Sequence, residues 1–167
     1  MPAMVPDVTI ADTLMKGNPP GPLSAGSRFT QSFTAEHDRL SAVEMEVSAY
    51  GRSITRGGFR LVLTEALDGP PLAIRDMPAS AIPNCCVYVR LTFPPLTHSA
   101  GKRYFISLSQ QGILPPDAIT VFMSGTDVYP RGEFFIGGKA TGQDTSFRSF
   151  YTPSGSFCGM CLSGDGL

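Results

Sequence analysis

A chain of 167 residues, 42% of them hydrophobic and 16% charged, has the size of one ordinary domain and can bury a core. The 18 glycines and 15 prolines favour many short strands joined by turns over long helices. A formal net charge of -1, without any cluster of Lys and Arg, excludes the basic surface typical of a nucleic-acid binder. No apolar run approaches the roughly 20 residues that span a bilayer, so we expect no direct membrane insertion.

The chain begins with a stretch rich in Pro and Gly, residues 1–27, which predicts an irregular leader with a short edge strand around Val8–Ile10. From Arg28 onward, apolar and polar residues alternate, as in half-buried strands. The predicted strands cover residues 28–34, 40–50, 59–64, 72–76, 86–93, 104–108, 118–124, 133–136 and 146–151. Residues 153–167 are mostly small and polar, which predicts a flexible tail.

These roughly eight or nine strands predict an all-β fold, an antiparallel β-sandwich of the jelly-roll type over residues 28–152. The stretch 86–108 is the centre of the pattern, with two strands joined by PPLTHSAGKR and an apolar face that a second layer must cover. We expect the strands 28–34 and 146–151 to pair in one sheet, because jelly rolls commonly bring the two chain ends together.

The four cysteines form two pairs, Cys85 with Cys86 and Cys158 with Cys161. A Cys-x-x-Cys pair can hold a metal ion or close a small disulfide. The second pair lies in a Gly/Ser-rich tail with no helical continuation, and adjacent cysteines in a strand point to opposite faces. We therefore expect structurally incidental thiols, with a tail disulfide and a metal site as the alternatives.

Enzymatic signatures are weak. His37 and His98 both lie in predicted loops, too few for a mononuclear metal enzyme, and Ser99 lacks the turn that exposes a catalytic serine. Glu44 and Glu46 are two residues apart, which fits a solvated strand face better than a glycosidase pair. No phosphate-binding glycine motif occurs. We expect neither catalysis nor a cofactor.

The alternative to a domain without any metal is a domain that holds a structural calcium ion. Two oxygen-rich turns, residues 36–38 (Glu-His-Asp) and 142–144 (Gly-Gln-Asp), supply the carboxylates and carbonyls that calcium prefers. Oxygen-rich turns are also common in proteins that bind no calcium, so this alternative stays open.

Binding is better supported, because sugar recognition needs an aromatic ring under the C–H face of a pyranose and planar donors for its hydroxyls. The candidate carbohydrate-binding residues are the outward pair Tyr88 and Arg90, and the loop pair Tyr50 and Arg52. Phe105 and Phe122 also point outward. In a sandwich, outward apolar residues mark an interface, so these two predict contact with a partner domain or a second copy.

A series of motifs connects these strands to known proteins. QSFTAEHDRLSAV (31–43), SAYGR (48–52), FRLVL (59–63), FPPLTHSAGKRYF (93–105) and DTSFR (144–148) occur in this order. Over about residues 28–151 the series resembles a non-catalytic β-sandwich module attached to bacterial glycosyltransferases and cell-surface polysaccharide proteins, similar to carbohydrate-binding jelly rolls. The chain contains no Trp, a frequent sugar-stacking residue in such modules.

The resemblance implies an accessory domain that binds a polysaccharide or another glycan and contacts a partner domain of a larger protein. It would lie at the cell envelope if that protein is membrane-associated, although the chain as given is expected to be soluble. The alternative function is a structural or assembly module, which docks a partner domain or self-associates without binding sugar. No nucleic acid is expected as a partner.

Overall fold

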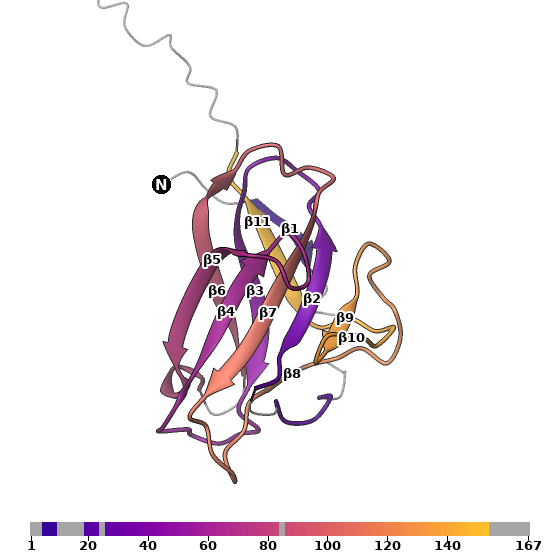
Figure 1. Ribbon diagram of the computed structural model, residues 1–167. Helices are drawn as coiled ribbons and strands as arrows, with labels where there is room; N and C mark the ends of the chain where they lie inside the picture. The colour runs from indigo at the N-terminus through magenta and orange to yellow at the C-terminus, as the bar shows by residue number, and fades with distance from the viewer. Residues whose placement is uncertain (1–4, 10–18, 24–25, 84–85, 154–167) are drawn as a thin grey trace, which may run out of the picture.

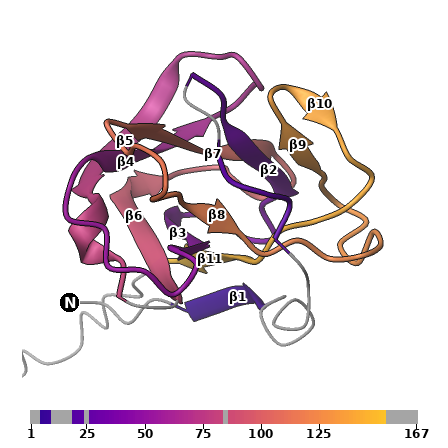
Figure 2. The same cartoon turned by 90° about the horizontal axis from the view of Figure 1, so that it is seen from below.

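A computed structural model describes residues 5–9, 19–23, 26–83 and 86–153 of the chain. Within these residues the chain forms eleven strands in two sheets, and every strand pair is antiparallel. Figures 1 and 2 show the two sheets as packed layers. The predicted antiparallel β-sandwich is confirmed. The one helical element of the described part is the 3-10 turn η1 (Ala79–Ala81), and no helix there could cross a membrane.

One layer is a five-stranded sheet with the order β1-β11-β3-β6, in which β8 also pairs with β3. Its strands are β1 (Val5–Thr9), β3 (Leu40–Ser48), β6 (Cys86–Leu96), β8 (Thr120–Val121) and β11 (Phe147–Tyr151). The other layer is a six-stranded sheet with the order β10-β9-β2-β7-β4-β5. Its strands are β2 (Phe29–Thr34), β4 (Gly58–Thr64), β5 (Pro71–Pro78), β7 (Arg103–Gln111), β9 (Phe134–Ile136) and β10 (Lys139–Ala140).

The connectivity is that of a jelly roll. The strands β1-β11-β3-β6 face the strands β2-β7-β4-β5, and the chain passes from one sheet to the other at almost every connection. The short strands β8, β9 and β10 lie between β7 and β11 in the sequence, and the β9–β10 hairpin extends the six-stranded sheet at one side (Figure 1).

The one expectation about pairing is wrong. The strands β2 and β11 lie in different sheets, because β1 takes the place beside β11, with Val5 opposite Tyr151. The observed β1 begins three residues earlier than the edge strand predicted around Val8. The two strands of the central stretch 86–108, β6 and β7, lie in opposite sheets, so each helps to cover the apolar face of the other. Strand β6 runs on through Pro94 and Pro95, which an edge strand tolerates because one side of its backbone has no pairing partner.

The core lies between the sheets and follows the alternation in the sequence. Aromatic side chains fill its centre, where the ring of Phe33 lies 5.5 Å from that of Phe147 and 5.9 Å from that of Tyr104. Met45 of β3 and Leu61 of β4 are fully buried from the two facing sheets. The inward residues are thus used for packing, and any binding surface must lie on the outer sheet faces or at the loops.

Candidate functional site

The outer face of the five-stranded sheet carries Tyr88 and Arg90, the first pair of predicted sugar-binding residues. The pairing register places Arg90 of β6 and Arg148 of β11 on either side of Glu44 of β3. The Arg90 Nε donates to the Glu44 carboxylate at 2.9 Å, and the Arg148 Nη1 lies 3.6 Å from its other oxygen. The three side chains form one row of alternating charge across three strands.

Two aromatic rings complete this network. The guanidinium of Arg90 lies 4.2 Å from the centre of the Phe150 ring, and that of Arg148 lies 3.6 Å from the centre of the Tyr88 ring. The Tyr88 hydroxyl forms a 2.6 Å hydrogen bond with Ser146, and burial raises the Tyr88 pKa. A sugar could stack on this face of Tyr88 only by displacing Arg148. The contacts that hold Tyr88 and Arg90 are therefore internal to the sheet.

The two glutamates of β3 are not solvated. Glu44 and Glu46 are only 7% and 6% exposed, so the expectation of a solvated strand face is wrong. The reason is the neighbouring strands, which place long side chains over this face, such as Arg90 beside Glu44 and Tyr88 opposite Glu46. A strand pattern predicts which face a residue occupies, but not whether its neighbours cover it.

Tyr50 and Arg52 lie apart from this network, in the loop that follows β3. Tyr50 is 43% exposed and has a left-handed backbone (φ 54°), followed by Gly51 with φ 74°. Arg52 is exposed, and its Nη1 lies 3.8 Å from a carboxylate oxygen of Asp117. Tyr88 lies within strand β6, opposite Glu46 of β3, whereas Tyr50 lies beyond the end of β3 at Ser48. One predicted pair is thus on a sheet face and the other is in a loop.

Phe105 and Phe122 belong to different sheets. Phe105 of β7 is only 8% exposed, because the Phe135 ring lies 6.2 Å away and the Arg103 guanidinium lies 5.7 Å over its ring. Phe122 follows β8 of the opposite sheet and is half-buried. The two residues do not form a common docking surface.

The turns considered for calcium are used by internal hydrogen bonds. Asp144 is fully buried; one carboxylate oxygen accepts from the Gln31 side chain at 2.9 Å, and the other accepts from the backbone N–H groups of Val128 and Tyr129. Burial raises the Asp144 pKa, and these hydrogen bonds oppose that shift. The Asp38 carboxylate accepts from the backbone of Ala100. Within the described residues, no three His, Cys, Asp or Glu side chains are grouped as metal ligands.

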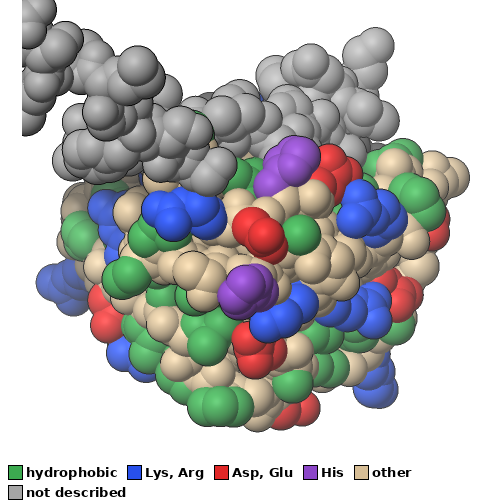
Figure 3. All heavy atoms as spheres, turned by 90° about the horizontal axis from the view of Figure 1, so that it is seen from above, with side chains coloured by type: hydrophobic (Ala, Val, Ile, Leu, Met, Phe, Trp, Pro, Cys, Tyr) green, Lys and Arg blue, Asp and Glu red, His purple; other side chains and the backbone are tan. Residues whose placement is uncertain are grey.

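Both histidines lie at the end of the molecule shown in Figure 3, among acidic and basic side chains. His37 packs edge-on against Tyr151 at 5.1 Å between ring centres. Ser99 is fully buried; its hydroxyl donates to the His37 carbonyl at 2.8 Å and accepts from the Leu40 N–H. This serine joins the β2–β3 and β6–β7 turns.

Cys86 is disulfide-bonded, so the expectation of an incidental thiol is wrong for this residue. It begins β6 at the edge of the five-stranded sheet, opposite Ser48, and the residue is half-buried. Cys85 and the Cys158–Cys161 pair lie outside the described residues, and so does the predicted tail after residue 153.

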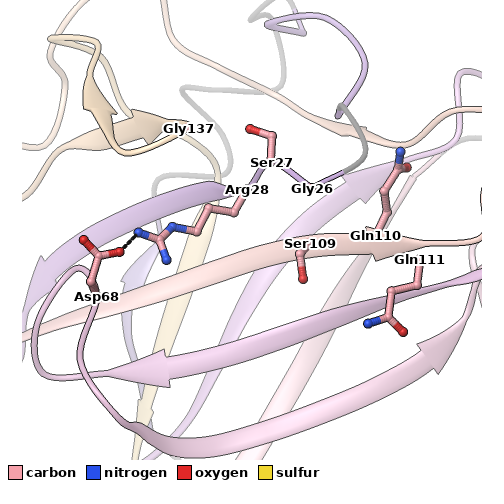
Figure 4. Close-up of a pocket in the computed structure, with 8 residues that line it drawn as sticks. All are labelled: Gly26, Ser27, Arg28, Asp68, Ser109, Gln110, Gln111 and Gly137. Atoms are coloured by element: carbon pink, nitrogen blue, oxygen red, sulfur yellow. Dashed lines mark hydrogen bonds and ion pairs between the residues drawn. The ribbon is translucent and has the colours of Figure 1, made fainter.

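A groove on the outer face of the six-stranded sheet was not predicted. It has a volume of about 730 Å³ and is lined by Gly26, Ser27, Arg28, Asp68, Ser109, Gln110, Gln111 and Gly137. Arg28 reaches across it to form an ion pair with Asp68 (Figure 4). Ser109 and Gln111 of β7 point to the same side in this view, whereas Gln110 points to the other.

The groove depends on register across the sheet. Ser109 of β7 lies opposite Arg60 of β4, and Gln111 lies opposite Gly58 of the same strand. On the other side β7 pairs with β2, which Arg28 immediately precedes. The sequence signal was the series of small polar residues at outward positions of a central strand, but it points to a groove only once the neighbouring strands are known.

No protein-family model matches the chain. No curated protein matches it either. The candidate sites therefore rest on their chemistry. The outer face of the five-stranded sheet is filled by its own ion pairs, and the loop at Tyr50 offers a single exposed ring. The groove on the six-stranded sheet combines hydroxyl, amide and guanidinium groups in one hollow.

Proposed function

We propose that this domain binds carbohydrate without catalysing a reaction, and that the sugar lies in the groove on the six-stranded sheet. The observation that carries the proposal is the lining of that groove. Ser109 offers a hydroxyl, Gln111 an amide and Arg28 a guanidinium, which are the groups that hydrogen-bond sugar hydroxyls. Pockets of this volume, about 730 Å³, are of the size that encloses small ligands.

The charge of the groove favours a neutral sugar. Its lining contains one cation, Arg28, and one anion, Asp68, which pair with each other. The Arg28 side chain is 33% exposed and that of Asp68 is 78% exposed, so the pair costs little to rearrange. A hydroxyl-rich ligand can accept from the guanidinium and donate to the carboxylate without leaving a net charge unpaired.

The order of motifs that resembles modules of polysaccharide proteins supports the same function. We accordingly propose that the domain is a non-catalytic accessory domain of a bacterial cell-envelope polysaccharide or glycosyltransferase protein. The alternative proposal, an assembly module, rested on Phe105 and Phe122. It is less well supported, because Phe105 is covered and the two residues lie on different sheets.

The test is a glycan-array screen of the full chain beside three variants. S109V/Q111L removes polar groups from the groove, Y50A removes the exposed loop ring, and Y88F removes only the hydroxyl bonded to Ser146. We expect glycan binding that is lost in S109V/Q111L and kept in the other two. Loss in Y50A alone would move the site to the loop, and absence of binding to every glycan would contradict the function.

A further inference from the structure

One edge of the six-stranded sheet is open. Strand β5 is the last strand on that side, and no strand of the described residues pairs with its other side (Figure 1). Ile74 lies near the middle of β5, is 48% exposed and stands directly opposite Val62 of β4. An open edge that carries an exposed β-branched side chain is a template for pairing with another strand.

The register of β5 shows which backbone groups face the open edge. Ala79 donates its N–H to the carbonyl of Gly57, so these two residues form a hydrogen-bonded pair of the antiparallel ladder. Every second pair of the register from there, up to Leu63 with Ala73, is bonded in the same way. Ile74 lies between two such pairs. Its N–H and C=O therefore point away from β4, to the open edge.

Two other sheet edges carry features that oppose pairing with a further chain. At the far side of the same sheet, β10 has only two residues, one of them the exposed Lys139. The edge strand β6 of the five-stranded sheet is covered by Arg75 of β5, whose guanidinium donates to the carbonyl of Arg90. On β5 such features stand at the ends of the strand, as a register shift beside Thr64 and as Pro78. The stretch around Ile74 stays open.

We propose that β5 pairs antiparallel with β5 of a second copy of this chain, about a two-fold axis beside Ile74. In this register the two Ile74 residues exchange both of their N–H and C=O bonds. Val62 and Ile74 of each copy then form one apolar row of four side chains across the joint. Ala73 lies opposite Arg75 of the second copy, so a small side chain leaves room for a long one. The edge is thus complementary to itself, which selects a second copy as its occupant.

The pairing closes as a dimer. Both copies use the same strand, so no β5 edge is left, and the joined sheet ends at the short β10 on either side. A contact of this length is small, so we expect a weak dimer whose population depends on concentration. The interface differs from the one expected at Phe105 and Phe122. It does not rest on the proposed sugar site.

The experiment is sedimentation equilibrium of the full chain over a concentration series, without any sugar. I74P removes the N–H that faces the edge and breaks no hydrogen bond to β4, and I74K places two like charges at the axis. Each change acts on both copies, so we expect the dissociation constant of the dimer to rise at least about tenfold. The matched control L114K changes an apolar side chain that is 69% exposed elsewhere, and should leave the dimer unchanged.

Isotope-filtered NMR on a mixture of labelled and unlabelled chains tests the register. We expect contacts between the Ile74 methyl groups of the two copies, and contacts from Ile74 to another part of the second copy would overturn the proposal. A monomer at every concentration would also overturn it, as would a dimer that I74P and I74K leave intact or that L114K weakens equally. Circular dichroism checks that each variant is folded, and I74K keeps the fold because it changes an exposed side chain.

Discussion

Glu44, on the outer face of the five-stranded sheet, is expected to contribute more to stability than a charge on a solvated strand face would. The carboxylate of Glu44 is nearly buried and lies between the guanidinium groups of Arg90 and Arg148. E44Q keeps the shape and removes the charge, so we expect it to lower the free energy of unfolding by about 1–3 kcal/mol. Urea unfolding measures this, with the exposed residue Glu65 changed to Gln as the control. An effect of E44Q no larger than that of E65Q would contradict the account.

The buried carboxyl of Asp144 makes stability depend on pH. Its pKa is raised in the folded chain above the unfolded value of about 3.9, mainly by burial. Its contribution to stability is therefore fully present below about pH 4 and is lost as the pH rises through the folded pKa. We expect the carboxyl carbon of Asp144 to titrate with a midpoint above about 3.9 in an NMR experiment. A midpoint below that value would show that its three hydrogen bonds outweigh burial.

At the scale of elements, the β8–β9 connection packs tightly against β2. A Cβ atom on Gly132 would overlap the carbonyl oxygen of Ser32 and lie 2.8 Å from its carbon, and Ser32 also bonds to Glu133 through backbone and side chain. Strand β2 cannot move away from residue 132 without losing these hydrogen bonds. We expect G132A to destabilise the domain by about 2 kcal/mol or more. G125A, which meets no atom within 4 Å, is the matched control in the same thermal unfolding experiment.

The strands themselves follow from local pattern. The strict alternation in β3, β4 and β7 places Val43, Leu61 and Ile106 in the core, because a side chain points to alternate faces in any strand. The pairing of β11 with β1 does not follow from local pattern, since it depends on a strand contributed by the leader. Likewise, the stacking of Arg148 on Tyr88 joins residues of β11 and β6 and becomes visible only when both strands flank β3.

At the scale of the whole molecule, the two outer faces have different characters. One sheet pairs its outward Glu and Arg side chains with each other, whereas the other places small hydroxyl residues at its centre and leaves a groove. The fold class could be predicted from the sequence because the sandwich needs only alternating strands and turns. The groove could not, because it needs Ser109 of β7, Arg28 before β2 and Asp68 after β4 to meet across three strands.

The central claim is that the six-stranded sheet carries a sugar-binding groove, and backbone NMR shift mapping tests it most directly. The labelled full chain is titrated with the glycan that binds best on the array. The account predicts that the largest shifts fall on Arg28, Ser109 and Gln111, with little change at Tyr88 and Phe150 of the opposite sheet. Shifts centred on Tyr88 and Phe150, or on the loop at Tyr50, would contradict it.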